Sequence, residues 1–271
     1  MIRIKGVGAV YGEVWYDEEL PVDAGVDIVQ YSQRPAPLRD GRSVPFMSLV
    51  TDLAVADDEI IAGFNKVCRY ELRRAARDDF QFQFLSDPAT QLDEFCRFHD
   101  RCAEQRSFYA CNRVWLASAC AARQLILTAA SHNGEALVWH AYVVAGKTAG
   151  LEYSCSYRDE DAARRALVGR ANRWLHWQDM QRFKETGIER YDWGGLFDDD
   201  SSPSRVGINE FKKGFGGRHE RSYDCELPIT ARGRLWLPVR DACRQVSRAR
   251  PRWSAAAWFH GRPAASQLQK G

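Results

Sequence analysis

The feature that most constrains this chain is the stretch from Tyr191 to Gly217, YDWGGLFDDDSSPSRVGINEFKKGFGG. A strand-like run, 188–193, ends at Gly194 and Gly195, and a polar loop then leads to two lysines beside three more glycines. Glycine permits backbone with φ > 0 and close main-chain approach, and lysine beside it brings ammonium donors next to exposed amides. This combination suits a phosphate or a developing oxyanion, and it also suits a surface hairpin with solvated lysines.

Charge is distributed unevenly along the 271 residues, although the net charge is only +2. Residues 231–271 carry a net charge of +8, and residues 1–230 carry −6. A basic end on an acidic body is typical of a surface that meets a polyanion, because neutralising phosphates releases counterions. The alternative is a solvated, partly disordered tail. With 45% hydrophobic residues, the chain can bury a full core as one large domain or two small ones.

The eight cysteines form no C-x-x-C pair, and most sit in apolar runs where cysteine behaves as a small hydrophobe. The sequence therefore predicts neither a structural zinc site nor a disulfide framework. The acidic run 198–200 is typical of a solvated loop more than of a Mg²⁺ site, so no metal is expected. No apolar run reaches the length of a membrane span, and the first residues, MIRIKGVGAVYGEV, contain no uninterrupted apolar h-region, which favours a cytoplasmic protein.

Hydrophobic periodicity predicts an α+β protein. Asn133-Gly134 and Gly146-Lys147 are strong hairpin signals within it. The predicted strands are 7–16, 26–31, 46–53, 80–85, 124–131, 136–145, 149–157, 188–193 and 223–227. The predicted helices are 57–77, 92–105, 114–122 and 161–186.

One face of the predicted helix 57–77 is cationic. Lys66, Arg69, Arg73 and Arg77 form a narrow stripe with Arg74 beside it. Such cations repel one another unless an anion or water shields them. The stripe is therefore either a docking surface for a phosphate-bearing substrate or a solvated helix face.

Four segments together resemble the Fem family of peptidyltransferases, which has the fold of the Gcn5-related acetyltransferases (GNAT). They are TDLAVADDEIIAGFNKVCRYELRRAARDDF, GRANRWLHWQDMQRFKETG, RYDWGG and GINEFKKGFGG, and the resemblance spans roughly residues 46–227. It implies a mixed sheet flanked by helices, with an abbreviated GNAT-like half at 1–105, a full catalytic half at 106–230 and a basic segment at 231–271. It also implies acyl transfer to an amine.

Carried over residue by residue, the resemblance places the lysine of the family's FK motif on Lys212. An ammonium there stabilises the oxyanion that forms when an amine attacks an ester or thioester. Asp192 is a candidate base or orienting group, or else a buried structural carboxylate. Tyr191 and Tyr157 are candidate acids for the leaving hydroxyl. The predicted substrate-binding residues are Phe211, Lys213, Arg69, Arg73, Arg74, Trp193, Gly194, Gly195, Gly169, Arg170 and Asn172.

Gly169 corresponds to the acetyltransferase pyrophosphate loop, where amides at a helix N-terminus hold phosphates. Ala166 stands where that loop has Arg or Gln, which weakens the case for coenzyme A. The chain is also shorter than peptidoglycan-bridge enzymes and has no coiled-coil arm, so a small-molecule or peptide acceptor, as in natural-product pathways, fits as well as a cell-wall precursor.

Three functions remain open from the sequence. The first is an aminoacyltransferase that uses aminoacyl-tRNA as co-substrate and needs no other cofactor. The second is an N-acyltransferase that uses acyl-coenzyme A. The third is a non-catalytic tRNA-binding protein that keeps the fold. Since no cysteine or serine lies in a nucleophile setting, direct aminolysis is the predicted mechanism for the enzymes.

Overall fold

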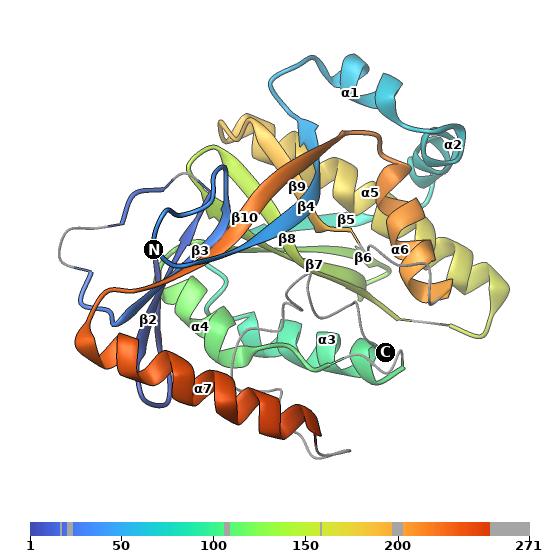
Figure 1. Ribbon diagram of the computed structural model, residues 1–271. Coiled ribbons are helices and arrows are strands. Elements are labelled where there is room, and N and C mark those ends of the chain that lie inside the picture. The colour runs from blue at the N-terminus through green and yellow to red at the C-terminus, as the bar shows by residue number, and fades with distance from the viewer. Residues whose placement is uncertain (17, 21–23, 106–108, 158, 197–202, 250–271) are drawn as a thin grey trace. The chain divides into compact units, whose positions relative to one another are not determined.

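The computed structural model describes residues 1–271 except 17, 21–23, 106–108, 158, 197–202 and 250–271 (Figure 1). Its tertiary contacts divide the chain into two compact units. The first comprises Met1–Phe46, Asn112–Ala122 and the described residues from Arg221 onward, and the second comprises Met47–Cys111 and Arg123–Glu220. Each unit combines segments that are far apart in sequence. The division into three consecutive segments at 105/106 and 230/231 stays a prediction.

The second unit is built on a mixed sheet, which confirms the predicted α+β class. Its strands lie in the order β4-β9-β8-β7-β6-β5, and all neighbours pair antiparallel except β8 and β9, which run parallel. Their bounds are β4 (Arg42–Asp52), β5 (Gln81–Leu85), β6 (Leu125–His132), β7 (Glu135–Ala145), β8 (Thr148–Ser156) and β9 (Arg190–Gly195).

Helices cover both faces of this sheet, α5 (Ala162–Glu185) on one and α3 (Leu92–Gln105) on the other (Figure 1). Side chains of β7 alternate between the two faces. Val138 joins an apolar cluster with Leu175 of α5, whereas Trp139 packs against Phe95 of α3 with ring centroids 6.2 Å apart. The centre of β7 is thus buried on both sides, which is why its sequence is apolar almost throughout.

The predicted helix 57–77 is wrong as one element, because two helices form instead: α1 (Asp57–Gly63) and α2 (Lys66–Ala75). Phe64 takes extended backbone after Gly63, and the Asn65 side chain accepts a hydrogen bond from the Cys68 amide as the N-cap of α2. A capping asparagine competes with helix continuation, since its side chain satisfies the first free amides of a new helix.

The polar loop predicted before the lysines is partly wrong. From Pro203 to Lys213 the chain forms helix α6, so both lysines lie in its last turn. The following Gly216 and Gly217 have φ of +71° and +91°. A Cβ on Gly216 would lie 2.6 Å from the carbonyl oxygen of Gly63, so only glycine fits this turn. The next strand is longer than predicted, β10 (Arg218–Pro228).

The first unit contains β1 (Ile2–Lys5), β2 (Val10–Trp15), β3 (Ile28–Arg34), most of β10, α4 (Arg113–Ala121) and α7 (Ala231–Ala249). β1 pairs antiparallel with β2, β2 parallel with β3, and β3 antiparallel with β10. The basic C-terminal segment therefore begins with a helix, α7, and not with a solvated tail. It is anchored because Trp236 donates to the Tyr11 hydroxyl at 2.8 Å and Arg240 forms a buried ion pair with Glu226. No helix in the described part of the chain is long and apolar enough to cross a membrane.

Candidate functional site

The carboxyl end of β9 is the centre of the candidate site. The register of the parallel pair β8–β9 ends at Gly150 and Asp192, although both strands continue. Ligands of open sheets that contain parallel strands bind outside such strand ends. The residues that the sequence singled out around YDWGG therefore lie where the sheet stops pairing on that side.

Lys212 joins α6 to this strand end. Its Nζ donates a hydrogen bond to the carbonyl oxygen of Gly195 at 2.8 Å, and the side chain is partly buried. A cation in the last turn of a helix is also favoured by the helix dipole. Lys213, one residue later, is exposed and its Nζ lies 3.4 Å from Glu210. The structure thus distinguishes the two lysines, since Lys212 is directed to β9 and Lys213 to its own helix.

Asp192 is buried and shapes the turn that follows it. Its Oδ1 accepts a hydrogen bond from the Gly194 amide at 2.7 Å. Gly194 has φ of +70°, and a Cβ there would lie 3.1 Å from the Leu151 carbonyl oxygen. This geometry fits the expectation of an orienting or structural carboxylate, because the side chain fixes the backbone that presents the Gly195 carbonyl to Lys212.

Tyr191 is fully buried at the centre of a polar network between β9, β7 and α5. Its hydroxyl lies 2.7 Å from the Tyr142 hydroxyl and 2.6 Å from His176 Nδ1. Asp179 Oδ2 lies 2.6 Å from the Tyr142 hydroxyl and 2.7 Å from His140 Nδ1. The members of this network, which we call the buried polar network, are His140, Tyr142, Asn172, His176, Asp179 and Tyr191.

Each tyrosine hydroxyl has a single proton to donate, and this fixes which atom is the donor in each hydrogen bond of the network. Tyr142 donates its single hydroxyl proton to Asp179, so Tyr191 must donate to Tyr142. The Tyr191 oxygen then accepts from His176, which places the imidazole proton on Nδ1. The donors therefore all point towards the Asp179 carboxylate. Its other oxygen, Oδ1, has no hydrogen-bond partner among the described residues.

Burial disfavours the charged forms of three members of this network, His176, Tyr142 and Tyr191. The pKa of His176 is held well below its ordinary value, first by desolvation and then by the charges of His140, Lys212 and Arg173. Burial also raises the pKa of Tyr142 and of Tyr191 well above the ordinary value near 10. Tyr191 thus reaches a substrate only through its neighbours, which argues against a direct role as the acid for a leaving group.

Aromatic side chains of β9 and α6 pack against His176 of the buried polar network. His176 lies 4.6 Å from the Trp193 ring and 5.6 Å from the Phe211 ring, as centroid distances. Trp193 is fully buried and donates to Thr51 Oγ1 at 3.0 Å, so it serves the core. Phe211 is half-buried, with the Arg173 guanidinium 5.0 Å from its centroid. Of these predicted binding residues, Phe211 is the one positioned beside Lys212 with part of its surface accessible.

The three predicted binding arginines of α2 divide into structural and exposed members. Arg69 donates to the carbonyl oxygens of Ala62 and Phe64 and so closes the end of α1. Arg73 and Arg74 are exposed. Arg74 lies 3.9 Å from Glu71, on the same helix. Of the three, Arg73 and Arg74 therefore remain suited to a phosphate-bearing ligand, one of the two interpretations of the cationic stripe.

Arg170 and Asn172 form hydrogen bonds inside the protein. Arg170 is buried and forms a bidentate pair with Asp78, at 2.6 Å and 3.1 Å, which fastens α5 to the end of α2. Asn172 Oδ1 lies 2.8 Å from His140 Nε2 at one end of the buried polar network. The prediction that Arg170 binds substrate is not supported by this geometry.

Gly169 does not open a helix, which corrects the pyrophosphate-loop expectation. Helix α5 begins at Ala162, and Gly169 lies within it. The true N-terminus is capped by Asp161, whose carboxylate accepts from the Arg164 amide at 2.7 Å, and Asp159 and Glu160 precede it. Three carboxylates at this helix end disfavour a pyrophosphate there.

The remaining predictions concern Tyr157 and two runs of residues that the structure does not describe. Tyr157 packs against Phe98 with centroids 4.3 Å apart, away from Lys212 on the α3 face. The acidic run 198–200 lies outside the described residues, as does 250–271.

Sequence reasoning missed His176, Asp179 and Tyr142. Their signal was a polar residue on the buried face of an otherwise apolar element: His140 and Tyr142 two apart on β7, and His176 and Asp179 three apart on α5. No local pattern pairs the strand with the helix, so the network emerges only from the tertiary fold.

A model of the acetyltransferase (GNAT) domain matches residues 62–213, more than half of the chain. The chain belongs to this family. Among solved structures, it resembles FemX with a TM-score of 0.55 at 15% identity, over 66% of this chain and 61% of FemX. The Fem-type fold predicted from the sequence is thereby confirmed. The chain matches less than two thirds of the FemX structure.

Two further structures share the GNAT fold of this chain. L-PGS from Bacillus licheniformis has a TM-score of 0.50 at 14% identity, over 90% of this chain and 87% of that one. The C-terminal domain of a putative lysylphosphatidylglycerol synthetase from Agrobacterium fabrum has 0.50 at 17%, over 80% and 72%. No curated protein sequence matches this chain.

Proposed function

We propose that this GNAT protein is an N-acyltransferase that moves an aminoacyl group from aminoacyl-tRNA to an amine acceptor by direct aminolysis. The observation that carries the proposal is the Lys212 ammonium, hydrogen-bonded to the Gly195 carbonyl at the end of β9. The acetyltransferase (GNAT) family and the fold shared with FemX, with L-PGS and with the domain of a putative lysylphosphatidylglycerol synthetase support it.

In the proposed reaction the acceptor amine attacks the ester carbonyl carbon. A C–N bond forms, the C–O bond to the ribose breaks, and the amine proton leaves as the ribose hydroxyl regains one. Lys212 stabilises the transient oxyanion by donating an N–H, a contribution that is typically a few kcal/mol. Asp192 acts as a positioning residue, because its bond to the Gly194 amide holds the Gly195 carbonyl at Lys212.

The choice of donor follows from charge. Coenzyme A binding needs free amides and low negative charge at the start of α5, where Asp159, Glu160 and Asp161 lie instead. A tRNA donor needs dispersed cations, which Arg73 and Arg74 on α2 and the four basic residues of 250–271 supply. The acceptor is a small molecule, a peptide or a cell-wall precursor bearing an amine, and the cytoplasm is the proposed location.

Donor binding tests the proposal most directly. The purified protein is incubated with radiolabelled aminoacyl-tRNAs and separately with labelled acetyl-CoA, and filter retention is measured. We expect retention of aminoacyl-tRNA at near-physiological salt. Retention of acetyl-CoA alone would replace this proposal by the second candidate, acyl-CoA-dependent N-acylation, which the acetyltransferase family match favours.

The role of Lys212 is tested by Lys212→Ala, with Lys213→Ala as the matched control one residue away. We expect Lys212→Ala to lower turnover at least about tenfold while donor affinity stays within severalfold, because an oxyanion contact acts mainly in the transition state. Lys213→Ala should retain turnover. Equal turnover of the two variants would remove Lys212 from the mechanism, and tRNA binding without transfer to any acceptor would leave a non-catalytic binder.

A further inference from the structure

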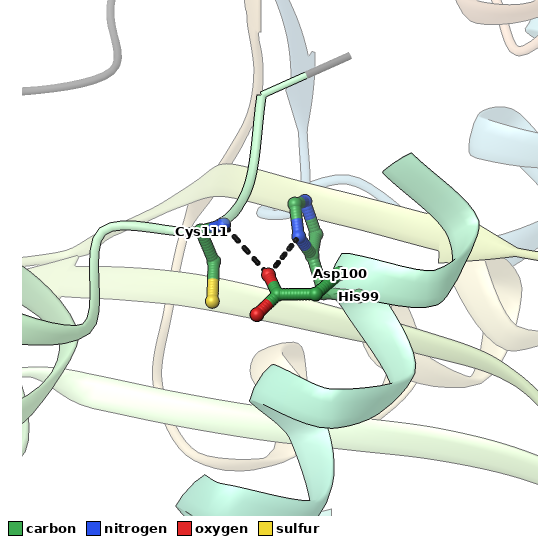
Figure 2. Close-up of side chains that lie close together, drawn as sticks. All are labelled: His99, Asp100 and Cys111. Carbon is green, nitrogen blue, oxygen red and sulfur yellow. Dashed lines mark hydrogen bonds and ion pairs between the residues drawn. The ribbon is translucent and has the colours of Figure 1, made fainter. Parts of the chain in front are cut away.

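A second cluster of reactive side chains lies on the face of the sheet that α3 covers, opposite to α5. It joins residues of α3 to Cys111. His99, Asp100 and Cys111 each offer one ligand atom, and these atoms lie within 4.8 Å of one another. Figure 2 shows the Cys111 sulfur and the Asp100 carboxylate facing each other, with the His99 ring beside them. Asp100 Oδ1 accepts from the Cys111 amide at 2.9 Å and lies 3.5 Å from His99 Nδ1.

Cys96 adds a fourth donor. It lies three and four residues before His99 and Asp100 on α3, so the three side chains share one helix face. Both cysteine side chains, Cys96 and Cys111, are buried. One sulfur, one imidazole and one carboxylate thus converge from two segments of the chain, and the Cys96 side chain lies on the same face of α3.

We propose that Cys96, His99, Asp100 and Cys111 form a binding site for a single Zn²⁺ ion. Zinc takes four ligands of these kinds, at about 2.3 Å for sulfur and about 2.0–2.2 Å for nitrogen and oxygen. Such bonds bring ligand atoms to roughly 3.3–3.8 Å from one another in a tetrahedron.

The environment of each donor fits this site. Burial lowers the pKa of His99, so the imidazole is neutral and able to coordinate. The ring is held edge-on against Tyr153 of β8, with centroids 5.0 Å apart. Zinc binds the thiolate form of cysteine, so zinc binding releases thiol protons to solvent and weakens as pH falls.

The site is structural in character. With four protein ligands it leaves no open position for a substrate, as in closed zinc sites. It would tie the segment ending at Cys111 to α3, on the face of the sheet opposite to α5 and the buried polar network. Its loss should therefore lower stability without removing the catalytic groups. Neither the C-x-x-C rule nor local spacing finds it, because Cys96 and Cys111 are 15 positions apart.

Metal titration tests the proposal. The full-length protein, stripped with chelator and kept reduced, is titrated with Zn²⁺ against a chromophoric chelator and with Co²⁺ by absorbance. We expect one equivalent of zinc, thiolate-to-cobalt charge-transfer bands, and a higher melting temperature with zinc. Binding well below one equivalent, or cobalt spectra without thiolate bands, would overturn it.

Variants separate this site from the other six cysteines. Cys111→Ser and His99→Gln should each weaken zinc binding at least about tenfold, whereas Cys243→Ser, at an exposed cysteine on α7, should bind normally. His99→Gln keeps both thiols, so it remains informative if Cys111→Ser does not fold. Unchanged zinc affinity in His99→Gln, with a folded circular dichroism spectrum, would contradict the proposed ligand set.

Discussion

At the scale of the residue, the chemistry of this protein depends on how burial fixes protonation. His176 is enclosed by aromatic rings, and its pKa is lowered because a charged imidazole loses its hydration there. Its single ring proton is donated to Tyr191, which in turn donates towards Asp179 through Tyr142. A neutral His176 is thus part of the folded state, and protonating it favours unfolding.

His176 should make stability depend on pH. Its folded-state pKa is below its unfolded value of about 6.5, so the unfolded state binds the extra proton first. The contribution is fully present above about pH 6.5 and is lost as pH falls below it, by up to about 1.4 kcal/mol per pH unit. We expect His176→Gln to flatten the fall in unfolding free energy between about pH 7 and about pH 5, measured by urea denaturation.

The control is His219→Gln, at an exposed histidine of β10. It should leave the pH dependence as in the parent protein. A pH dependence that survives in His176→Gln would mean that the carboxylates, and not this imidazole, cause it.

At the scale of the element, α6 shows what local sequence can and cannot predict. Periodic elements such as Leu92–Gln105 were predicted with matching ends, because an apolar stripe at helical spacing needs no tertiary information. The polar run before the two lysines predicts a loop, whereas helix α6 forms from Pro203 onward. Lys212 was identified correctly as a candidate residue, but the contact with Gly195 required the packing of a helix onto a strand end.

Two glycines, one within α6 and one in the turn after it, should respond oppositely to replacement by alanine. Gly207 lies within α6, and a Cβ added there would meet no atom within 4 Å, so Gly207→Ala should stabilise the protein by about 0.5–1 kcal/mol. Gly216 has φ of +71° and faces the Gly63 carbonyl, so Gly216→Ala should destabilise by about 2 kcal/mol or more. Urea denaturation of both variants measures the difference. Equal effects would show that the turn after α6 relaxes freely.

The ion pair that fastens α5 to the end of α2 offers a second prediction at this scale. Arg170→Ala leaves the Asp78 carboxylate without its bidentate partner, 20% exposed, so we expect a loss of about 2 kcal/mol. Arg164→Ala, on the same helix, breaks exposed ion pairs and should have a much smaller effect. Comparable losses in urea denaturation would contradict a structural role that is specific to Arg170.

At the scale of the whole molecule, the charge count from the sequence overstates the cations available to a polyanion. Arg240 contributes to the +8 of the C-terminal segment, yet it is 2% exposed and neutralised by Glu226 and Asp241. Arg232 is exposed but lies 3.9 Å from Asp27. By sequence, the most one-sided charge belongs to the 22 residues 250–271, which carry Arg250, Arg252, Arg262 and Lys270 and contain no acid.

If the donor is a tRNA, this last segment should contribute to its binding through counterion release. Ending the chain after Ala249 removes four positive charges, which should lower the slope of log affinity against log salt by up to roughly 3. The matched control keeps the full length and replaces the four basic residues by Gln, and it should behave like the truncation if charge alone matters. Lys212→Ala should keep the parent slope. An unaltered slope in both the truncated and the neutralised chain would assign tRNA binding to the exposed arginines of α2, where Arg73→Gln with Arg74→Gln becomes the next comparison.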